Sequence, residues 1–221
     1  MPAPPPAPTV DLVRMSAIER DFPLFPLGIV ALPSEVVPLH IFEERYKTMI
    51  GECLDADSEF GIVWMSDDEL KAIGCACEVT EVLERTEDGR MNILTRGTRP
   101  FRVLERQDEL PYPAGAVQFL EDRDEPVDQE ALDAAHAVYA DLVEQATDKR
   151  PQEAELATMG AYEMAATVDF GAEAKQGLLD LRSETARLRL LVRLFRAAAK
   201  RLALVERAQA RARSNGKVRF G

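Results

Sequence analysis

Three cysteines and two histidines are the residues of this chain best suited to metal or nucleophilic chemistry. Cys75 and Cys77, together with Cys53 and His40, could in principle supply four ligands to a zinc ion. Zinc sites usually place two or more residues between paired cysteines, so that both sulfurs reach one tetrahedral ion. A single intervening residue on a strand is a poor match. We therefore expect no metal and interpret the three cysteines as reduced, small core residues.

A thiol nucleophile would need an exposed cysteine beside a base that a third residue orients. The sequence gives no sign of such an arrangement. His40 lies at the end of an apolar strand, where we expect a backbone partner, and His136 lies near the apolar face of a helix. We predict neither enzyme activity nor a cofactor. The alternative is a small thiol- or metal-dependent enzyme that uses Cys53, Cys75, Cys77 and His40.

Carboxylates are numerous between residues 121 and 155 but follow no pattern. Paired carboxylates for general acid and base catalysis require two groups in defined positions. A run of scattered acidic residues is more typical of a solvated surface. We interpret this region as an acidic outer face.

The stretch FPLFPLGIVALPSEVVPLHIFEERY, residues 22–46, should position most of these side chains. Its apolar runs are separated by Pro23, Pro26 and Gly28 and then by Pro33 and Pro38, which predicts strand, turn and strand. A helix should follow over residues 42–54. Its expected apolar face recurs at three- and four-residue spacing: Phe42, Tyr46, Met49, Ile50 and Cys53.

Short strands separated by turn signals occupy the next part of the chain. We expect strands at residues 60–65, 73–83, 91–95, 101–106 and 114–120, with a bend or bulge at Gly74 and a break at Gly97. Asp88 and Gly89 form the clearest hairpin signal, because this pair accepts the positive backbone angles of a tight turn. Six or seven strands at near-regular spacing suggest a small closed or half-closed barrel.

Helical periodicity replaces the strand pattern after the acidic, proline-ended segment 121–126. Helices are expected at residues 128–146, 153–168 and 172–181. Ser183 is the expected N-cap of a fourth, longer helix. Apolar residues recur along that helix as in a bundle seam: Leu188, Leu191, Phe195, Ala198, Leu202 and Val205. The predicted fold class is α+β.

The net charge of −12 is unevenly distributed. Residues 182–219 contain twelve Lys and Arg against two Glu, a net charge of +10, so the remainder carries −22. A body this acidic repels phosphate backbones and disfavours nucleic-acid binding. RNA binding through the basic last helix is kept as an alternative.

No apolar run approaches the roughly 20 residues needed to cross a bilayer, so a membrane span is not expected. The Pro- and Ala-rich N-terminus lacks the pattern of a signal peptide. We expect a cytoplasmic protein.

Several motifs together resemble the N-terminal substrate-binding domain of the Lon protease family. The most specific one lies in the opening stretch: Phe25-Pro26-Leu27-Gly28, then Pro33, then Pro38-Leu39-His40-Ile41-Phe42-Glu43 with Arg45-Tyr46. Further matches follow in order: Gly74, Asp88-Gly89-Arg90, Arg96-Gly97 with Arg99 and Phe101, and Lys175-Gln176 before Leu178-Leu179. The resemblance covers about residues 20–205.

This resemblance implies a PUA-like β pseudobarrel of about six strands and one helix, followed by a C-terminal helical bundle. We expect a flexible arm at 1–20, a barrel subdomain at 21–122, a bundle subdomain at 126–212 and a frayed tail at 213–221. Neither a GxxxxGK[ST] loop nor a counterpart of the Ser-Lys peptidase pair occurs in the sequence. The chain is therefore similar to free-standing bacterial proteins that consist of the Lon substrate-binding domain alone.

The expected function is non-catalytic recognition of polypeptides, by analogy with this domain. Unfolded or apolar segments are the expected ligands, and a separate protease is a candidate partner. A proline-broken loop tends to be exposed, so Leu32, Pro33, Val36 and Val37 are candidates to line a binding groove. Trp64 and Met65 are interpreted mainly as core, with the rim of an apolar groove as the minority reading.

Overall fold

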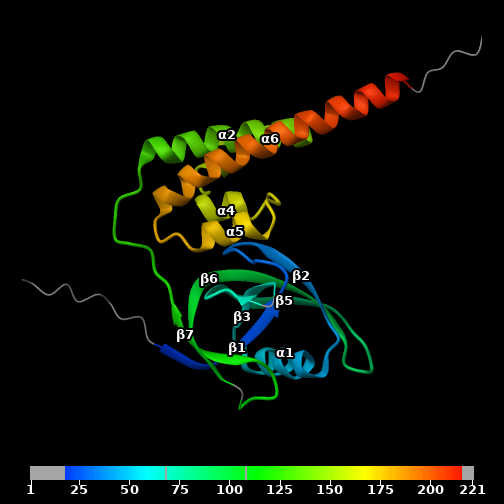
Figure 1. The fold of residues 1–221 in the computed structure, drawn as a ribbon, viewed down its shortest axis with the longest axis vertical. Helices are drawn as coiled ribbons and strands as arrows, with labels where there is room; N and C mark the ends of the chain where they lie inside the picture. The colour runs from blue at the N-terminus through cyan, green and yellow to red at the C-terminus, as the bar shows by residue number, and fades with distance from the viewer. Residues whose placement is uncertain (1–17, 68, 108, 216–221) are drawn as a thin grey trace, which may run out of the picture.

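The computed structural model describes residues 18–67, 69–107 and 109–215, with side chains described as far as residue 208 (Figure 1). A strand-rich half comes first in the sequence and a helical half follows it. Figure 1 shows helices α2 and α6 outermost, with α4 and α5 between them and the sheet. Helix α1 lies against the opposite side of the strand-rich half.

Seven strands form one sheet in the described part of the chain. Their bounds are β1 Ile18–Leu27, β2 Val36–Ile41, β3 Phe60–Ser66, β4 Glu69–Leu70, β5 Ile73–Arg85, β6 Met91–Gln107 and β7 Ala114–Phe119. The strand order is β1-β7-β6-β5-β3-β4, and β2 pairs with β6 beside this path. Helix α1, Glu44–Ala56, lies between β2 and β3 in the sequence.

The sheet bends round onto itself because β1 pairs with strands at two distant places. It is antiparallel to β7, with Ile18 opposite Gln118, and parallel to β3, with Leu24 opposite Gly61. The result is not a regular barrel, since β2 lies off the path and pairs only with one end of β6. The predicted α+β class is confirmed.

Strand β1 begins earlier than expected. Ile18, Glu19 and Arg20 belong to the arm expected from the sequence, but they form the first residues of β1, and Ile18 and Glu19 pair with β7. Pairing with a neighbouring strand outweighs the weak local pattern of this segment. Residues 1–17 lie outside the described residues. At the other end the expected tail begins inside α6, which extends to Asn215.

The expected break at Gly97 is wrong, because β6 runs without interruption for 17 residues. Gly97 is instead a point of close backbone approach: a Cβ built there would lie 2.0 Å from the carbonyl oxygen of Leu32. Glycine therefore allows the turn at residues 31–35 to pack directly on the strand. Gly74 precedes a shift in register between Cys75 and Cys77, in agreement with the expected bulge.

Six helices are present in the described residues. Besides α1, they are α2 Gln129–Thr147, α3 Glu153–Leu156, α4 Ala161–Ala165, α5 Ala172–Leu179 and α6 Glu184–Asn215. Asp128 caps α2 by accepting from the backbone N–H groups of Glu130 and Ala131. Ser183 accepts from the N–H of Ala186 at 3.2 Å, as expected for the start of α6.

The single helix expected at residues 153–168 is wrong, because α3 and α4 are separate short helices. Side-chain contacts, two of them with residues 23 positions away, hold the chain out of helical form between them. The carbonyl oxygen of Met159 accepts from His136 Nε2 at 2.8 Å. The N–H of Gly160 donates to Glu163, and that of Ala161 to Glu184 at 2.6 Å. These carboxylates satisfy the free N–H groups at the start of α4.

One hydrophobic cluster extends through both halves of the molecule. It contains buried residues of the sheet and α1, such as Phe25 and Ile50, and of the helices, such as Tyr139, Leu178 and Phe195. A smaller cluster around Phe22 and Phe101 fills the other side of the sheet. Burial on this scale in one connected core is the main source of stability.

Polar contacts also join the two halves. Lys175 of α5 forms an ion pair with Glu35, and the Gln176 side chain donates to the carbonyl oxygen of Ile73 at 3.2 Å. Arg187 of α6 is 2% exposed and binds both Asp122 and Glu184. Among the described residues, no helix is both long enough and apolar enough to span a membrane.

Candidate functional site

The exposed surface that best fits a binding role lies on the three strands β2, β6 and β5. Strand β6 runs between the other two, and cross-strand rows place His40 and Glu84 on either side of Asn92. Residues directly opposite one another in antiparallel strands share one side of the sheet. We call this surface the hairpin face and define it by Val36, Pro38, His40, Phe42, Leu83, Glu84, Asn92 and Leu94.

Every second side chain from Val36 to Phe42 points outward. Val36 is 53% exposed and Phe42 59%, and Pro38 and His40 between them are also exposed. Val37 and Ile41 point into the core, as strand alternation requires. Leu83 on β5 adds a further apolar side chain, 54% exposed. The hairpin face thus presents large apolar groups to solvent.

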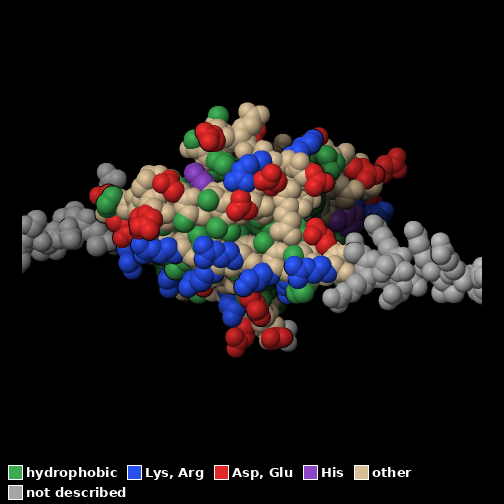
Figure 2. Space-filling model, turned by 90° about the horizontal axis from the view of Figure 1, so that it is seen from above, with side chains coloured by type: hydrophobic (Ala, Val, Ile, Leu, Met, Phe, Trp, Pro, Cys, Tyr) green, Lys and Arg blue, Asp and Glu red, His purple; other side chains and the backbone are tan. Residues whose placement is uncertain are grey.

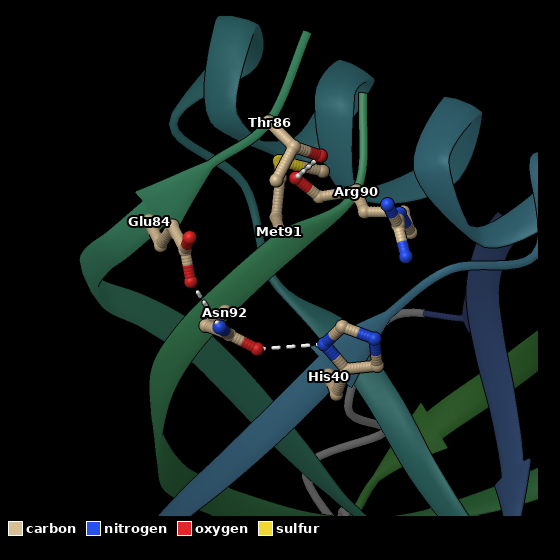
Figure 3. A pocket seen from close by; sticks show the side chains of 6 residues that line it. All are labelled: His40, Glu84, Thr86, Arg90, Met91 and Asn92. Atoms are coloured by element: carbon tan, nitrogen blue, oxygen red, sulfur yellow. Dashed lines mark hydrogen bonds between the residues drawn. The ribbon is translucent and has the colours of Figure 1, made fainter. Parts of the chain in front are cut away.

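Two adjoining cavities hollow the hairpin face. One has a volume of about 270 Å³ and is lined by His40, Glu84, Thr86, Arg90, Met91 and Asn92 (Figure 3). The other, about 520 Å³, is lined by Pro38, Leu39, His40, Leu83, Glu84, Asn92 and Ile93. They share His40, Glu84 and Asn92, so these three polar side chains lie where the two cavities adjoin.

The shared polar residues form a hydrogen-bonded chain (Figure 3). Asn92 Nδ2 donates to Glu84 Oε2 at 2.7 Å, so the amide oxygen of Asn92 faces His40 Nδ1, 2.6 Å away. Because an amide oxygen only accepts, His40 Nδ1 must carry the hydrogen. The other ring nitrogen, Nε2, is then the atom that can meet a ligand. His40 also stacks on Phe42, with ring centroids 5.7 Å apart.

The hairpin turn beyond these residues is fixed by its own polar contacts. Asp88 accepts from the Thr86 hydroxyl and pairs with Arg90 at 2.8 Å. The hydrogen bond from Thr86 and the bonds and charge of Arg90 hold the pKa of Asp88 below its usual range. Lys47 of α1 donates to the carbonyl oxygen of Asp88 at 2.8 Å. The end of the hairpin is thereby attached to α1.

Three of the six predicted binding residues are buried, so the expectation that they would be exposed is wrong. Leu32 is 0% exposed, and Pro33 and Val37 are also buried. Their turn is held on β6 because Ser34 N donates to Gly97 O at 2.8 Å and Gly97 N donates to Glu35 O at 2.9 Å. These residues support the hairpin face from behind and do not line it.

The other three predicted residues lie in two different places. Val36 is part of the hairpin face. Trp64 is half-buried, with the Lys71 ammonium 5.6 Å from its ring centroid, and Met65 is 40% exposed at the end of β3. Trp64 and Met65 line neither of the two cavities. The structure therefore does not bring them together with Val36 in one groove.

The cysteines lie in the core and are not part of the hairpin face. Cys53 is 3% exposed and Cys75 and Cys77 are 0% exposed, and burial raises the pKa of the Cys53 and Cys75 thiols. A buried, protonated thiol is a poor nucleophile and a poor metal ligand. Within the described residues, no three His, Cys, Asp or Glu side chains are grouped so that they could hold a metal ion. The alternative zinc or thiol site is therefore not assembled.

Sequence reasoning missed Phe42, Leu83 and Asn92. The three- and four-residue spacing predicts Phe42 on the buried face of the first helix, but α1 begins at Glu44 with Glu43 as its N-cap, so Phe42 continues the outward row of β2. The signal was present in the sequence: residues 36, 38, 40 and 42 form one side of a strand. Leu83 and Asn92 become part of a surface only when β5 and β6 pair.

Solved structures with the same arrangement define the class of domain. The chain is similar to the crystal structure of a Lon N-terminal domain protein from Xanthomonas campestris, with a TM-score of 0.59 and 26% identity over 77% of this chain and 96% of that one. The N-terminal domain of Mycobacterium avium complex Lon protease has a TM-score of 0.58, over 79% of this chain and 97% of that one. At 20% identity it supports the fold alone. The fold is that of a Lon N-terminal domain.

The sequence itself identifies the family. Residues 21–196 match the family model of the ATP-dependent protease La (LON) substrate-binding domain. Curated relatives include Lon protease 2 of Myxococcus xanthus, 27% identical over 202 residues, and Lon protease of Anaeromyxobacter dehalogenans, 25% identical over 203 residues. Each match covers 83% of this chain but 24% of the relative. The chain belongs to the Lon substrate-binding domain family.

Proposed function

We propose that this domain is a non-catalytic recognition module that binds apolar or unfolded polypeptide segments on the hairpin face. The family to which it belongs is described as substrate-binding. The single observation that carries the proposal is a cavity of about 520 Å³ lined by Pro38 and Leu83, with Val36 and Phe42 exposed in the same outward row as Pro38. Exposed apolar groups at the edge of a concave surface are typical of a protein interaction site.

An extended segment fits this surface better than a folded partner does. A strand-like peptide alternates its side chains, so every second residue can enter a pocket while its backbone stays accessible to hydrogen-bonding groups. In the proposed complex an apolar side chain of the ligand enters the cavity between Pro38 and Leu83. The His40 ring and the Asn92 amide lie next to the ligand backbone, where they can exchange hydrogen bonds with it.

We also propose the setting in which this recognition operates. Bound segments would pass to a protease module, whether that module is joined to this domain or separate from it. The cytoplasm is the proposed location, since the relatives that match are Lon proteases. Neither proposal requires a cofactor.

Titration of labelled unfolded polypeptides, followed by fluorescence anisotropy, tests the proposed site. The variant carrying Phe42→Ser and Leu83→Ser should bind at least about tenfold more weakly, since losing one apolar contact worth about 1.4 kcal/mol already has that effect. Leu104→Ser with Val127→Ser is the matched control, because these side chains are 45% and 46% exposed and lie outside the hairpin face. Equal affinities for the two variants would refute the assignment of the hairpin face.

A further inference from the structure

Helix α6 carries a row of cations on a side turned away from its buried seam. Leu188, Leu191 and Phe195 are buried, and the outward side chains recur at intervals of four, three, four and seven residues. We call them the basic stripe: Arg189, Arg193, Arg196, Lys200 and Arg207. All five are exposed. At a rise of about 1.5 Å per residue the row is about 27 Å long.

Most of this stripe has no counter-charge within the chain. Arg189 pairs with Asp128 at 2.6 Å. Within the described residues, no carboxylate forms an ion pair with Arg193, Arg196, Lys200 or Arg207. Four neighbouring cations on a protein of net charge −12 are thus free to bind a partner of opposite charge.

Helix α2 exposes the complementary charges. Glu130, Asp133, Asp141 and Glu144 are exposed at spacings that place them on one side of the helix, and we call them the acidic row. Arg150 binds Asp141 and Glu144, while Glu130 has no ion pair among the described residues. Figure 2 shows Lys and Arg side chains in a band across this side of the molecule, with Asp and Glu side chains next to it.

The two helices run side by side in the same direction. Their starts are joined by the hydrogen bond from Asp128 N to the Thr185 hydroxyl, at 3.0 Å, and further along Tyr139 contacts Phe195, with ring centroids 5.4 Å apart. This register places residue 144 of α2 level with residue 200 of α6. An acidic row and a basic stripe of similar length therefore lie parallel and in register on one molecule.

We propose that this surface binds a second copy of the same chain, with a two-fold axis along the helices. Rotation about such an axis sets the acidic row of each copy against the basic stripe of the other. One self-complementary patch thus forms both halves of the contact, as in most homodimers. A nucleic-acid strand fits less well, because the acidic row beside the stripe and the net charge of −22 outside residues 182–219 repel phosphates.

The far end of α6 supports the same arrangement. Helix α6 projects past the end of α2 (Figure 1), and there Leu204 is 63% exposed and Val205 52% exposed. A two-fold axis along the helices brings both projecting ends to the same end of the dimer. Their apolar side chains can then pack against each other and add hydrophobic burial to the charge contacts.

Sedimentation equilibrium at high micromolar concentration tests the dimer through a charge exchange. One variant carries Arg196→Glu and Lys200→Glu, and the other carries Asp141→Arg and Glu144→Arg. We expect the wild-type chain to have a dimer mass, each variant a monomer mass, and an equimolar mixture of the two a dimer mass again. Only the mixed pair restores opposite charges at both contacts. About 1 M salt, which shortens the screening length to about 3 Å, should dissociate the wild-type dimer.

Arg102→Glu with Arg106→Glu is the matched control, because both side chains are exposed on β6 and the change in charge equals that of the first variant. It should remain dimeric. A monomeric wild-type chain, or a mixture that stays monomeric, would overturn the proposal. Retention of labelled RNA by the wild-type chain that is lost on Arg196→Glu and Lys200→Glu, without any dimer, would assign the stripe to nucleic acid and also overturn it.

Discussion

Replacing Gly97 by alanine should destabilise the protein more than any ordinary surface substitution. An alanine Cβ at this position would lie 2.0 Å from the carbonyl oxygen of Leu32 and 2.8 Å from its carbonyl carbon. Both are backbone atoms of the turn that packs on β6, so no side-chain rotation can relieve the contact. The turn itself must move away from the strand.

The expected loss follows from the contacts that this movement breaks. Ser34 N to Gly97 O, at 2.8 Å, and Gly97 N to Glu35 O, at 2.9 Å, are worth about 1 kcal/mol each. Leu32, now fully buried, would become partly exposed, and complete exposure of a leucine costs about 1.5–3 kcal/mol. The free energy of unfolding should fall by about 3–4 kcal/mol, a large part of the roughly 5–15 kcal/mol typical of a domain.

Urea unfolding followed by far-ultraviolet circular dichroism measures this loss. Gly28→Ala is the control, because no atom lies within 4 Å of a Cβ built at Gly28 and its backbone angle is ordinary. A decrease below about 0.5 kcal/mol for Gly97→Ala, which is the range of ordinary surface substitutions, would show that the turn is not held against β6 as described. Weaker polypeptide binding should accompany the predicted loss, since β2 begins directly after the turn.

Three further substitutions test other parts of the fold. Arg187→Met should lower the free energy of unfolding, measured in urea, by about 2–3 kcal/mol. This loss is smaller than that for breaking a fully buried ion pair, because the partner Asp122 is 39% exposed. Gly51→Ala in α1 should raise the melting temperature, because nothing lies within 4 Å of the added Cβ and alanine favours a helix by about 0.5–1 kcal/mol. The Arg189 hydrogen bond and the backbone N–H groups of the cap hold the pKa of Asp128 low. The ionised Asp128 carboxylate therefore stabilises the fold fully above about pH 4, and this stabilisation is lost as the pH falls further. Asp128→Asn should have a lower free energy of unfolding than wild type in urea at pH 7, and the difference should shrink in acid.

Local sequence patterns correctly predicted the helices and strands in which one pattern extends over the whole element. A short continuous apolar run predicted β3, alternation predicted β5, the Asp88-Gly89 pair predicted the hairpin turn, and three- and four-residue spacing predicted α2 and α6. The two wrong elements depend on contacts between distant residues. Gly97 does not end a strand because the backbone of Leu32 packs on it, and residues 153–168 are interrupted partly because His136 binds the carbonyl oxygen of Met159.

The candidate site was less predictable for the same reason. Whether a proline-broken turn is exposed depends on what packs against it, and here β6 covers Leu32 and Pro33 from more than 60 positions away in the sequence. The hairpin face exists only after β2, β6 and β5 pair, which no single segment encodes. The proposed boundary at residues 121–126 remains a prediction, since buried side chains from both sides of it belong to one hydrophobic cluster.

The burial of all three cysteines gives this protein an internal probe of its own motions. An alkylating reagent reacts with an exposed thiolate, so a folded molecule whose thiols are at most 3% exposed can be labelled only while it is open. Cys53 reports on the release of α1, and Cys75 and Cys77 report on the separation of the sheet from the helical half. Without any introduced residue, the labelling rates of these thiols therefore measure whether a bound polypeptide suppresses local opening of the domain or leaves it unchanged.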